Sequence, residues 1–122
     1  MSSPCFLLDE HIPHAVARGL RLREPGLQVL ILGHPGAPPL TTSDPDLLIW
    51  IEEHGCLLVT NNRASMPGHL RNHLAANRHI LGILTVPRRF TIGNIIDELH
   101  LIWGASLPEE FQDQIVHLPL AP

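Results

Sequence analysis

Residues 56–63 read Cys-Leu-Leu-Val-Thr-Asn-Asn-Arg, an apolar run that stops abruptly at four polar residues. An apolar run without polar alternation is typical of a strand buried on both faces, as in a parallel sheet covered by helices. In open α/β sheets, ligands bind beyond the carboxyl ends of the strands. We therefore expect Thr60, Asn61, Asn62 and Arg63 to face a binding crevice, with Thr60, Asn61 and Arg63 as substrate-binding residues and Asn62 as a candidate catalytic residue.

A second apolar run ends in the same way. Residues 6–8 (Phe-Leu-Leu) lead directly into Asp9, Glu10 and His11. If the two strands are neighbours in the sheet, their polar ends form one small pocket on an apolar scaffold. This pocket is the candidate active site.

The rest of the chain alternates predicted strands with predicted helices. Strands are expected at residues 5–8, 27–32, 56–60 and 80–86, with a short edge strand at 115–118. Helices are expected to begin at Pro13, at Ser43 or Asp44, at Met66 and near Thr91, and to end near residues 24, 54, 77 and 104. This order predicts a single α/β domain, a three-layer sandwich with a mainly parallel sheet. Its core should span about residues 5–104, with a C-terminal extension over 105–122.

Composition and cysteine placement indicate the environment of the protein. A chain of 122 residues suits one domain. Cys5 and Cys56 each open an apolar run, so we expect two buried thiols rather than a disulfide. There is no basic segment followed by an apolar leader, and no apolar run approaches the roughly twenty residues of a membrane span. We therefore expect a soluble cytoplasmic protein without a membrane partner.

Charge is distributed unevenly along the chain. Residues 54–96 hold five arginines and no acid, whereas residues 1–53 hold seven acids and three arginines, and residues 97–122 hold five acids and no arginine. All the basic residues are arginines, which suit phosphate recognition, although a GC-rich codon bias explains the lack of lysine at least as well. Within the basic block, Arg63, Arg88 and Arg89 are candidate substrate-binding residues.

Several acids are placed where a metal site would need them. Asp9, Asp44 and Asp46 each lie where a strand meets a helix, and oxygen ligands from separate elements are how magnesium or manganese is held. Asp44 and Asp46 are equally explained by the start of a helix, where acids favour the positive dipole end. Asp9 and Glu10 have no such structural reason. We therefore take Asp9, Glu10, Asp44 and Asp46 as candidate catalytic residues, with Asp9, Asp44 and Asp46 as metal ligands.

Histidines give weaker signals. His69 and His73 are four residues apart on a predicted helix, a spacing at which two imidazoles can share a metal, but a solvated or phosphate-facing helix surface is the favoured interpretation. His11 and His14, close to Asp9, are either proton carriers or hydrogen-bonded residues of a helix start.

Three stretches together carry a family resemblance. They are residues 6–13 (Phe-Leu-Leu-Asp-Glu-His-Ile-Pro), 43–48 (Ser-Asp-Pro-Asp-Leu-Leu) and 58–63 (Leu-Val-Thr-Asn-Asn-Arg). In this order they resemble the uncharacterised small PIN-like proteins of bacteria, over about residues 5–104. The resemblance implies a parallel sheet between helices, with acids at the strand ends that bind divalent metal for RNA cleavage. Many members of the family are toxins paired with an antitoxin.

The resemblance transfers to individual residues with one departure. Asp9 matches the first acid of the family pattern and Asp44 the second, with Asp46 as a substitute, but the third acid falls on Asn62. An amide oxygen can coordinate a cation but adds no charge. Two functions therefore stay open. One is a magnesium- or manganese-dependent ribonuclease, a toxin with an antitoxin partner, in which Asn62 orients phosphate or water. The other is a PIN-like domain that binds RNA or a protein partner without cutting.

A phospho-receiver domain shares the strand and helix order and the paired acids after the first strand. It requires an aspartate after the third strand and a lysine, whereas this chain has Asn61 and Asn62 there and no lysine. We therefore exclude it.

The last predicted helix carries more apolar surface than a small sheet needs. Ile92, Ile96, Leu99 and Trp103 recur at helical spacing. Exposed apolar patches of this kind usually mark an interface, so the sequence predicts a homodimer.

Overall fold

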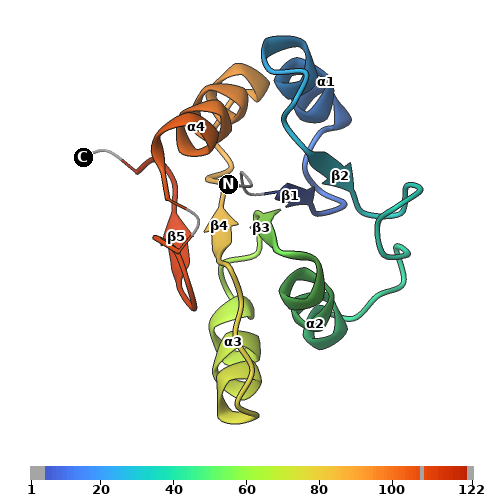
Figure 1. Cartoon of the computed structure of the whole chain (residues 1–122), viewed down its shortest axis with the longest axis vertical. Coiled ribbons are helices and arrows are strands. Elements are labelled where there is room, and N and C mark those ends of the chain that lie inside the picture. Colours follow the sequence, from blue (N-terminus) through green and yellow to red (C-terminus); the bar gives the residue numbers. More distant parts are fainter. Residues whose placement is uncertain (1–4, 108, 121–122) are drawn as a thin grey trace.

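The computed structural model describes residues 5–107 and 109–120 (Figure 1). Within these residues, five strands alternate with four helices, as the sequence predicts. The strands are β1 (Cys5–Leu8), β2 (Val29–Ile31), β3 (Cys56–Thr60), β4 (Ile83–Thr85) and β5 (Ile115–His117). The helices are α1 (His14–Arg23), α2 (Asp44–His54), α3 (Met66–Ala75) and α4 (Ile92–Ala105).

The five strands form one sheet in the order β2-β1-β3-β4-β5, and every neighbouring pair is parallel. The predicted α/β sandwich with a mainly parallel sheet is confirmed. From β1, the chain crosses first to β2 on one side and later to β3 on the other. Such a reversal leaves a crevice at the carboxyl ends of the two central strands, here β1 and β3.

Helices cover both faces of the sheet, with α1 and α4 on one side and α2 and α3 on the other (Figure 1). Alternate side chains of β1 enter different cores: Phe6 and Leu8 join the core under α1 and α4, and Leu7 joins the core under α2 and α3. All residues of β1 and β3 are buried. Burial on both faces is why these strands show unbroken apolar runs in the sequence.

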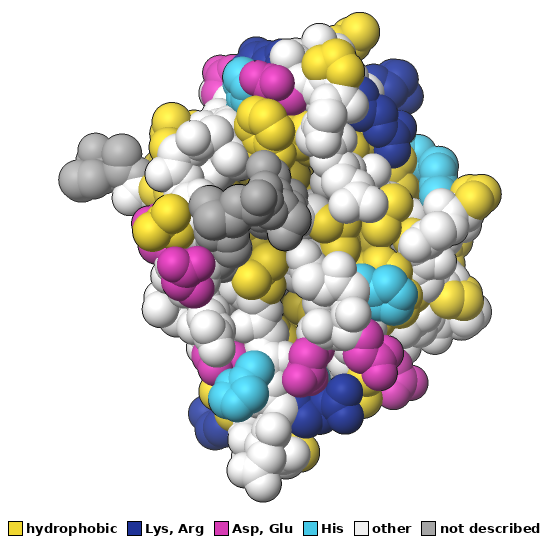
Figure 2. All heavy atoms as spheres, viewed as in Figure 1, with side chains coloured by type: hydrophobic (Ala, Val, Ile, Leu, Met, Phe, Trp, Pro, Cys, Tyr) yellow, Lys and Arg dark blue, Asp and Glu magenta, His cyan; other side chains and the backbone are white. Residues whose placement is uncertain are grey.

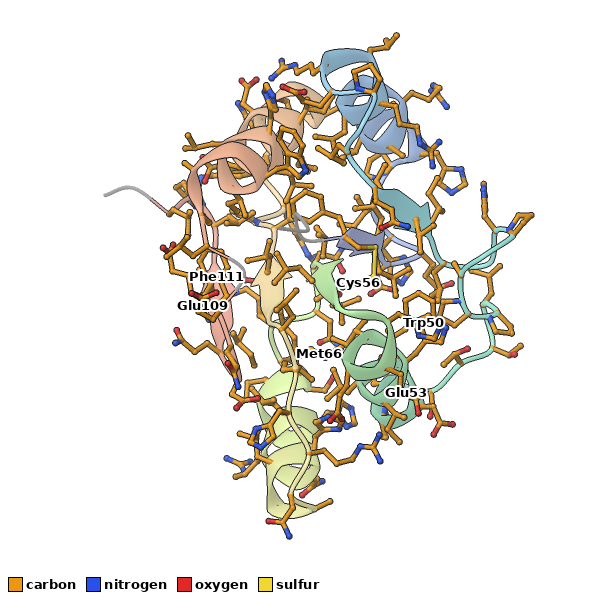
Figure 3. All side chains as sticks on the ribbon, viewed as in Figure 1. Trp50, Glu53, Cys56, Met66, Glu109 and Phe111 are labelled. Atoms are coloured by element: carbon orange, nitrogen blue, oxygen red, sulfur yellow. A yellow bond between two sulfur atoms is a disulfide. The ribbon has the colours of Figure 1, made fainter. Side chains whose placement is uncertain are left out.

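The two cysteines are not separate thiols, and that prediction was wrong. Cys5 and Cys56 are register partners at the start of β1 and β3, with Cα atoms 4.4 Å apart, and they form a disulfide. Figure 3 labels Cys56 at the start of β3. Both residues are buried, as expected. The sequence gives the burial of each cysteine but not the adjacency of the two strands that carry them.

Helix starts follow the local sequence. At α2, the Ser43 hydroxyl accepts the Asp46 N–H at 3.3 Å, Pro45 lies in the first turn, and Gly55 ends the helix with a left-handed φ of 67°. At α4, Thr91 and Asn94 cap each other, side chain to backbone, at 3.0 Å in both directions.

Three strands are shorter than predicted, β5 by one residue because it ends at His117. Strand β2 covers residues 29–31 rather than 27–32, and β4 covers 83–85 rather than 80–86. The flanking Leu27, Ile80 and Val86 are apolar because they are buried in the cores, not because they belong to a strand. In α3, His73 is buried, so it does not belong to the solvated helix surface that the sequence favours.

The C-terminal segment belongs to the core. Strand β5 pairs with β4, and Phe111 and Leu118 are 5% and 4% exposed within the core under α1 and α4. The core therefore reaches residue 118, beyond the expected limit at 104. The ends of the predicted domain, residues 1–4 and 121–122, lie outside the described residues, as does residue 108 within the extension.

The apolar side of α4 is largely used inside the protomer. Leu99 is fully buried, and Ile96 packs so closely on Gly19 of α1 that a Cβ there would lie 2.3 Å from its Cδ1. Ile92 keeps 41% of its surface exposed. The homodimer stays a prediction, with less apolar surface available than the sequence suggested. No helix in the described residues is long and apolar enough to cross a membrane.

A polar network joins α2, α3 and the approaches to β4 and β5. We call Glu52, His73, Arg78, His79 and Asp113 the α2–α3 network. Glu52 accepts a hydrogen bond from Arg78 Nε at 2.9 Å and lies 3.0 Å from His73 Nε2. In the region of α2 and α3, Figure 2 shows acidic, arginine and histidine side chains next to one another.

Asp113 closes the other half of this network. It accepts the Ile80 N–H at 2.8 Å and lies 2.7 Å from His79 Nδ1. Burial raises the pKa of Glu52, but hydrogen bonds from the His79 N–H and Arg78, with the charges of Arg78 and His73, outweigh it and hold the pKa below 4.5. Burial likewise raises the pKa of Asp113, and hydrogen bonds from Ile80 and His79 bring it below 3.8.

This network makes stability depend on pH. Because the pKa of Glu52 is lower in the folded state, its stabilisation is complete above its ordinary value of 4.5 and is lost as pH falls through the folded pKa. Glu52→Gln should therefore cost on the order of 1–2 kcal/mol at pH 7, and much less at pH 3. Urea unfolding at both pH values measures this difference. Glu53→Gln, an exposed neighbour on α2 (Figure 3), is the control, and an equal cost at both pH values would contradict the assignment.

Candidate functional site

A hollow of about 1070 Å³ lies at the carboxyl ends of β1, β3 and β4, where the strand order predicts a crevice. We call it the strand-end cleft. Its walls come from the β1–α1 turn, the loop before α2, the β3–α3 turn and the segment between β4 and α4. Its polar lining residues are Asp9, Glu10, His11, Thr42, Asp44, Asn61, Asn62, Arg63, Arg88 and Arg89.

Asp9 is held rigidly at the end of β1. Its backbone N–H donates to Val59 O at 2.9 Å, which continues the ladder between β1 and β3. Its Oδ1 accepts the Glu10 N–H and its Oδ2 accepts the Thr60 hydroxyl, both at 2.7 Å. The half-buried carboxylate is therefore oriented by the neighbouring strand and faces the cleft in one position.

Thr60 does not line the cleft, contrary to the expectation of a substrate contact. It is fully buried, and its hydroxyl donates to Asp9 while accepting the Asn62 N–H at 3.1 Å. Thr60 therefore positions Asp9 and the β3–α3 turn from behind.

Asn62 lines the cleft, but its amide is engaged in the turn that leads into α3. The Oδ1 atom accepts the Ser65 N–H at 3.2 Å, and Nδ2 donates to Ser65 Oγ at 2.6 Å. An aspartate at position 62 would still have an oxygen that accepts the Ser65 N–H. The turn is therefore compatible with the acid that the family pattern has at this position.

The two acids at the start of α2 lie in different surroundings. Asp44 lines the cleft, and its Oδ2 lies 3.5 Å from His69 Nε2 on α3. Asp46 is exposed and is not part of the lining. His69 and His73 do not share a partner, since His73 pairs with Glu52 at the other end of α2.

The carboxylates do not assemble a metal site in their present positions. Among residues 5–107 and 109–120, no three His, Cys, Asp or Glu side chains converge closely enough to hold a metal ion. Of the three expected ligands, only Asp9 and Asp44 face the cleft, and the Asn62 amide is already bonded to Ser65. The magnesium or manganese site therefore stays a prediction from the sequence, with Asp9 and Asp44 as the expected ligands that line the cleft.

Three arginines give the cleft its positive charge. Arg63, Arg88 and Arg89 are exposed lining residues, and no described carboxylate lies within ion-pair distance of any of them. Ile92, the first residue of α4, also lines the cleft, and the first turn of this helix has no acid. The positive end of the helix dipole therefore adds to the arginine charges.

The structure distinguishes the surroundings of His11 and His14, the two histidines close to Asp9 in the sequence. His11 lines the cleft, with Nε2 4.0 Å from Glu10 Oε1. His14 is not in the lining, and its ring contacts the His34 ring edge-on at 4.9 Å between centroids. Of the two, only His11 lies where a proton carrier could meet a ligand.

Sequence reasoning missed Phe90 and the pairing of His69 with Asp44. Phe90 lies between Arg89 and the cap of α4, outside any periodic apolar pattern, so the sequence carries no signal for its place in the cleft. The His69 contact depends on α3 lying beside α2, which periodicity does not reveal.

No family model, curated protein or solved structure matches this chain. The resemblance to small PIN-like proteins therefore rests on the three short stretches and their order.

Thr60→Val tests how the site is supported. It leaves Asp9 Oδ2 and the Asn62 N–H without their partner, and should cost about 1–3 kcal/mol of unfolding free energy. Urea unfolding measures the loss. Thr60→Ser is the matched control, because it keeps the hydroxyl and removes only a methyl group. A serine variant that is less stable than the valine variant would show that packing, not hydrogen bonding, is the contribution of Thr60.

Proposed function

We propose that this protein is a PIN-like domain that binds single-stranded RNA in the strand-end cleft. The observation that carries the proposal is the set of exposed arginines, Arg63, Arg88 and Arg89, around one cleft without carboxylate partners among the described residues. These guanidinium groups are free to form paired hydrogen bonds with phosphate oxygens. Because they come from two different turns, they can contact successive phosphates of one strand.

The acids of the cleft fit the same ligand. Carboxylates repel phosphate, but Asp9, Glu10 and Asp44 can accept hydrogen bonds from base amino groups and from ribose 2′-hydroxyls. The cleft, at about 1070 Å³, is slightly larger than the roughly 300–1,000 Å³ range of small-molecule sites. A mixed arginine and carboxylate lining of this extent favours an oligonucleotide over a single small anion.

A protein with an RNA ligand would work in the cytoplasm, so we propose the compartment that the sequence predicts. The disulfide between Cys5 and Cys56 has to persist there against reduction. Both cysteines are at most 5% exposed, which shields the bond from thiols in solution.

Arginine substitution tests the binding. Arg88→Gln and Arg89→Gln should each weaken binding to single-stranded RNA, because each removes a phosphate contact. Each should also reduce the slope of log K against log salt by about 0.7–1. Fluorescence anisotropy with a labelled oligonucleotide between 50 and 200 mM salt provides the measurement.

Arg18→Gln is the matched control for this test. Arg18 is an exposed arginine on α1 that does not line the cleft. If its loss weakens binding as much as the loss of Arg88, the attraction is a property of the whole surface and the cleft is not the site.

RNA cleavage is a second candidate, favoured by one observation. Asp9, Glu10 and Asp44 line the cleft together with Asn62, at the positions where the PIN-like pattern has acids. The missing charge at residue 62 is the reason to expect binding without cleavage. A toxin role, and with it an antitoxin partner, depends on cleavage.

Asn62→Asp separates the two candidates. The new carboxylate keeps an acceptor for the Ser65 N–H and adds a negative charge to the cleft, so it should raise manganese affinity several-fold and raise any ribonuclease activity. Asp9→Asn should lower both. Calorimetric titration with manganese and gel analysis of labelled RNA measure these effects.

Asn61→Asp is the control for position, since Asn61 also lines the cleft. If it raises manganese affinity and Asn62→Asp does not, residue 62 is not the missing ligand. Cleavage of RNA by the wild-type protein in manganese would overturn the proposal of binding without cleavage.

A further inference from the structure

A second hollow lies next to the strand-end cleft. This second hollow, which we call the side hollow, has a volume of about 420 Å³, and its lining is Arg89, Phe90, Asn94, Asp97, Glu98 and Pro119. Arg89 and Phe90 line both hollows. A strand that leaves the cleft on this side therefore passes over these two side chains.

Phe90 has the properties of a stacking platform. Within the described residues it is the one Phe or Trp side chain that lines either hollow, and its ring is half-buried. The Arg89 guanidinium carbon lies 5.8 Å from the ring centroid. Aromatic rings and adjacent guanidinium planes are the surfaces on which single-stranded bases stack. Phe6 and Phe111 are buried in the core and cannot serve this role.

The side hollow is chemically different from the cleft. Asp97 is paired with Arg23 at 2.6 Å, and Glu98 Oε1 accepts the Leu120 N–H at 2.9 Å. Among residues 5–107 and 109–120, no group forms a hydrogen bond with Glu98 Oε2. Two carboxylates repel phosphate but accept hydrogen bonds from amino groups. Phe90 and Pro119 supply apolar ring surfaces. This combination fits a base and not the backbone of the strand.

We infer that Arg89 and Phe90 stack a base of the bound RNA, and that the side hollow takes a base with an exocyclic amino group, which donates to Glu98. The inference rests on the proposed function, since the phosphates of that strand occupy the strand-end cleft. Cytosine offers its N4 amino group to a carboxylate, whereas uracil presents the O4 acceptor at the same place and is disfavoured. The protein therefore prefers oligo-C to oligo-U.

Substitution of Phe90 tests the stacking. Phe90→Leu keeps apolar volume but removes the π face, and should weaken binding to single-stranded RNA about tenfold. The salt slope should stay unchanged, because no charge is lost. Phe90→Trp, which keeps an aromatic face, should bind RNA as tightly as the wild type. If the ring only filled space in the fold, the larger Trp side chain would not preserve the affinity.

Substitution of Glu98 tests the base preference. In Glu98→Gln, the amide oxygen can still accept the Leu120 N–H, while the new NH₂ group donates to uracil O4. Anisotropy titrations should show several-fold tighter binding of oligo-C than of oligo-U to the wild type, and a lost or reversed preference in the variant. Glu53→Gln, exposed on α2 and in neither lining, is the control.

The outcomes separate the inference from the proposed function. If Arg88→Gln weakens RNA binding and Phe90→Leu does not, the cleft binds RNA but the stacking assignment is wrong. Equal affinity of the wild type for oligo-C and oligo-U overturns the assignment of the side hollow. If the wild type does not bind single-stranded RNA at all, the proposed function itself fails, and the inference with it.

Discussion

The pairing of β1 with β3 is the interaction on which the rest of the structure depends. Four residue pairs, from Cys5 with Cys56 to Leu8 with Val59, bring two apolar strands together in parallel register. The same register places a disulfide at one end and the Asp9–Thr60 hydrogen bond at the other. Because strand order reverses here, the polar end of this pair opens into the strand-end cleft, and the fold creates the site without a dedicated element.

The polar groups behind the cleft are used mainly for support. The Thr60 hydroxyl donates to Asp9, the Asn62 N–H donates to Thr60, and the Ser65 N–H, just before α3, donates to the Asn62 side chain. Such a chain makes the wall rigid, because each group is held by the next. It also occupies oxygens that a cation would need. Arg63, Arg88 and Arg89, which also line the cleft, form no ion pair with a carboxylate of the described residues.

Two histidine–carboxylate pairs, His69–Asp44 and His73–Glu52, lie at opposite ends of α2 and have different roles. At one end, His69 lies near Asp44 beside the cleft. At the other, His73 lies near Glu52, which Arg78 and the His79 N–H also contact. The second pair belongs to a network in which every charge has a partner, and it stabilises the fold. The His69–Asp44 pair is partly solvated and borders the strand-end cleft.

The sequence by itself determined the elements and their character. Continuous apolar runs gave β1 and β3 with their observed bounds, and Ser43, Pro45 and Gly55 gave α2, because these signals act within a few residues. Tertiary structure alone decided what lies side by side: the disulfide, the burial of Thr60, the choice of Asp44 over Asp46, and the place of Phe90 between two hollows. Each of these depends on which strands and helices are neighbours. Adjacency is set by the packing of the whole chain, and a local pattern of residues carries no information about it.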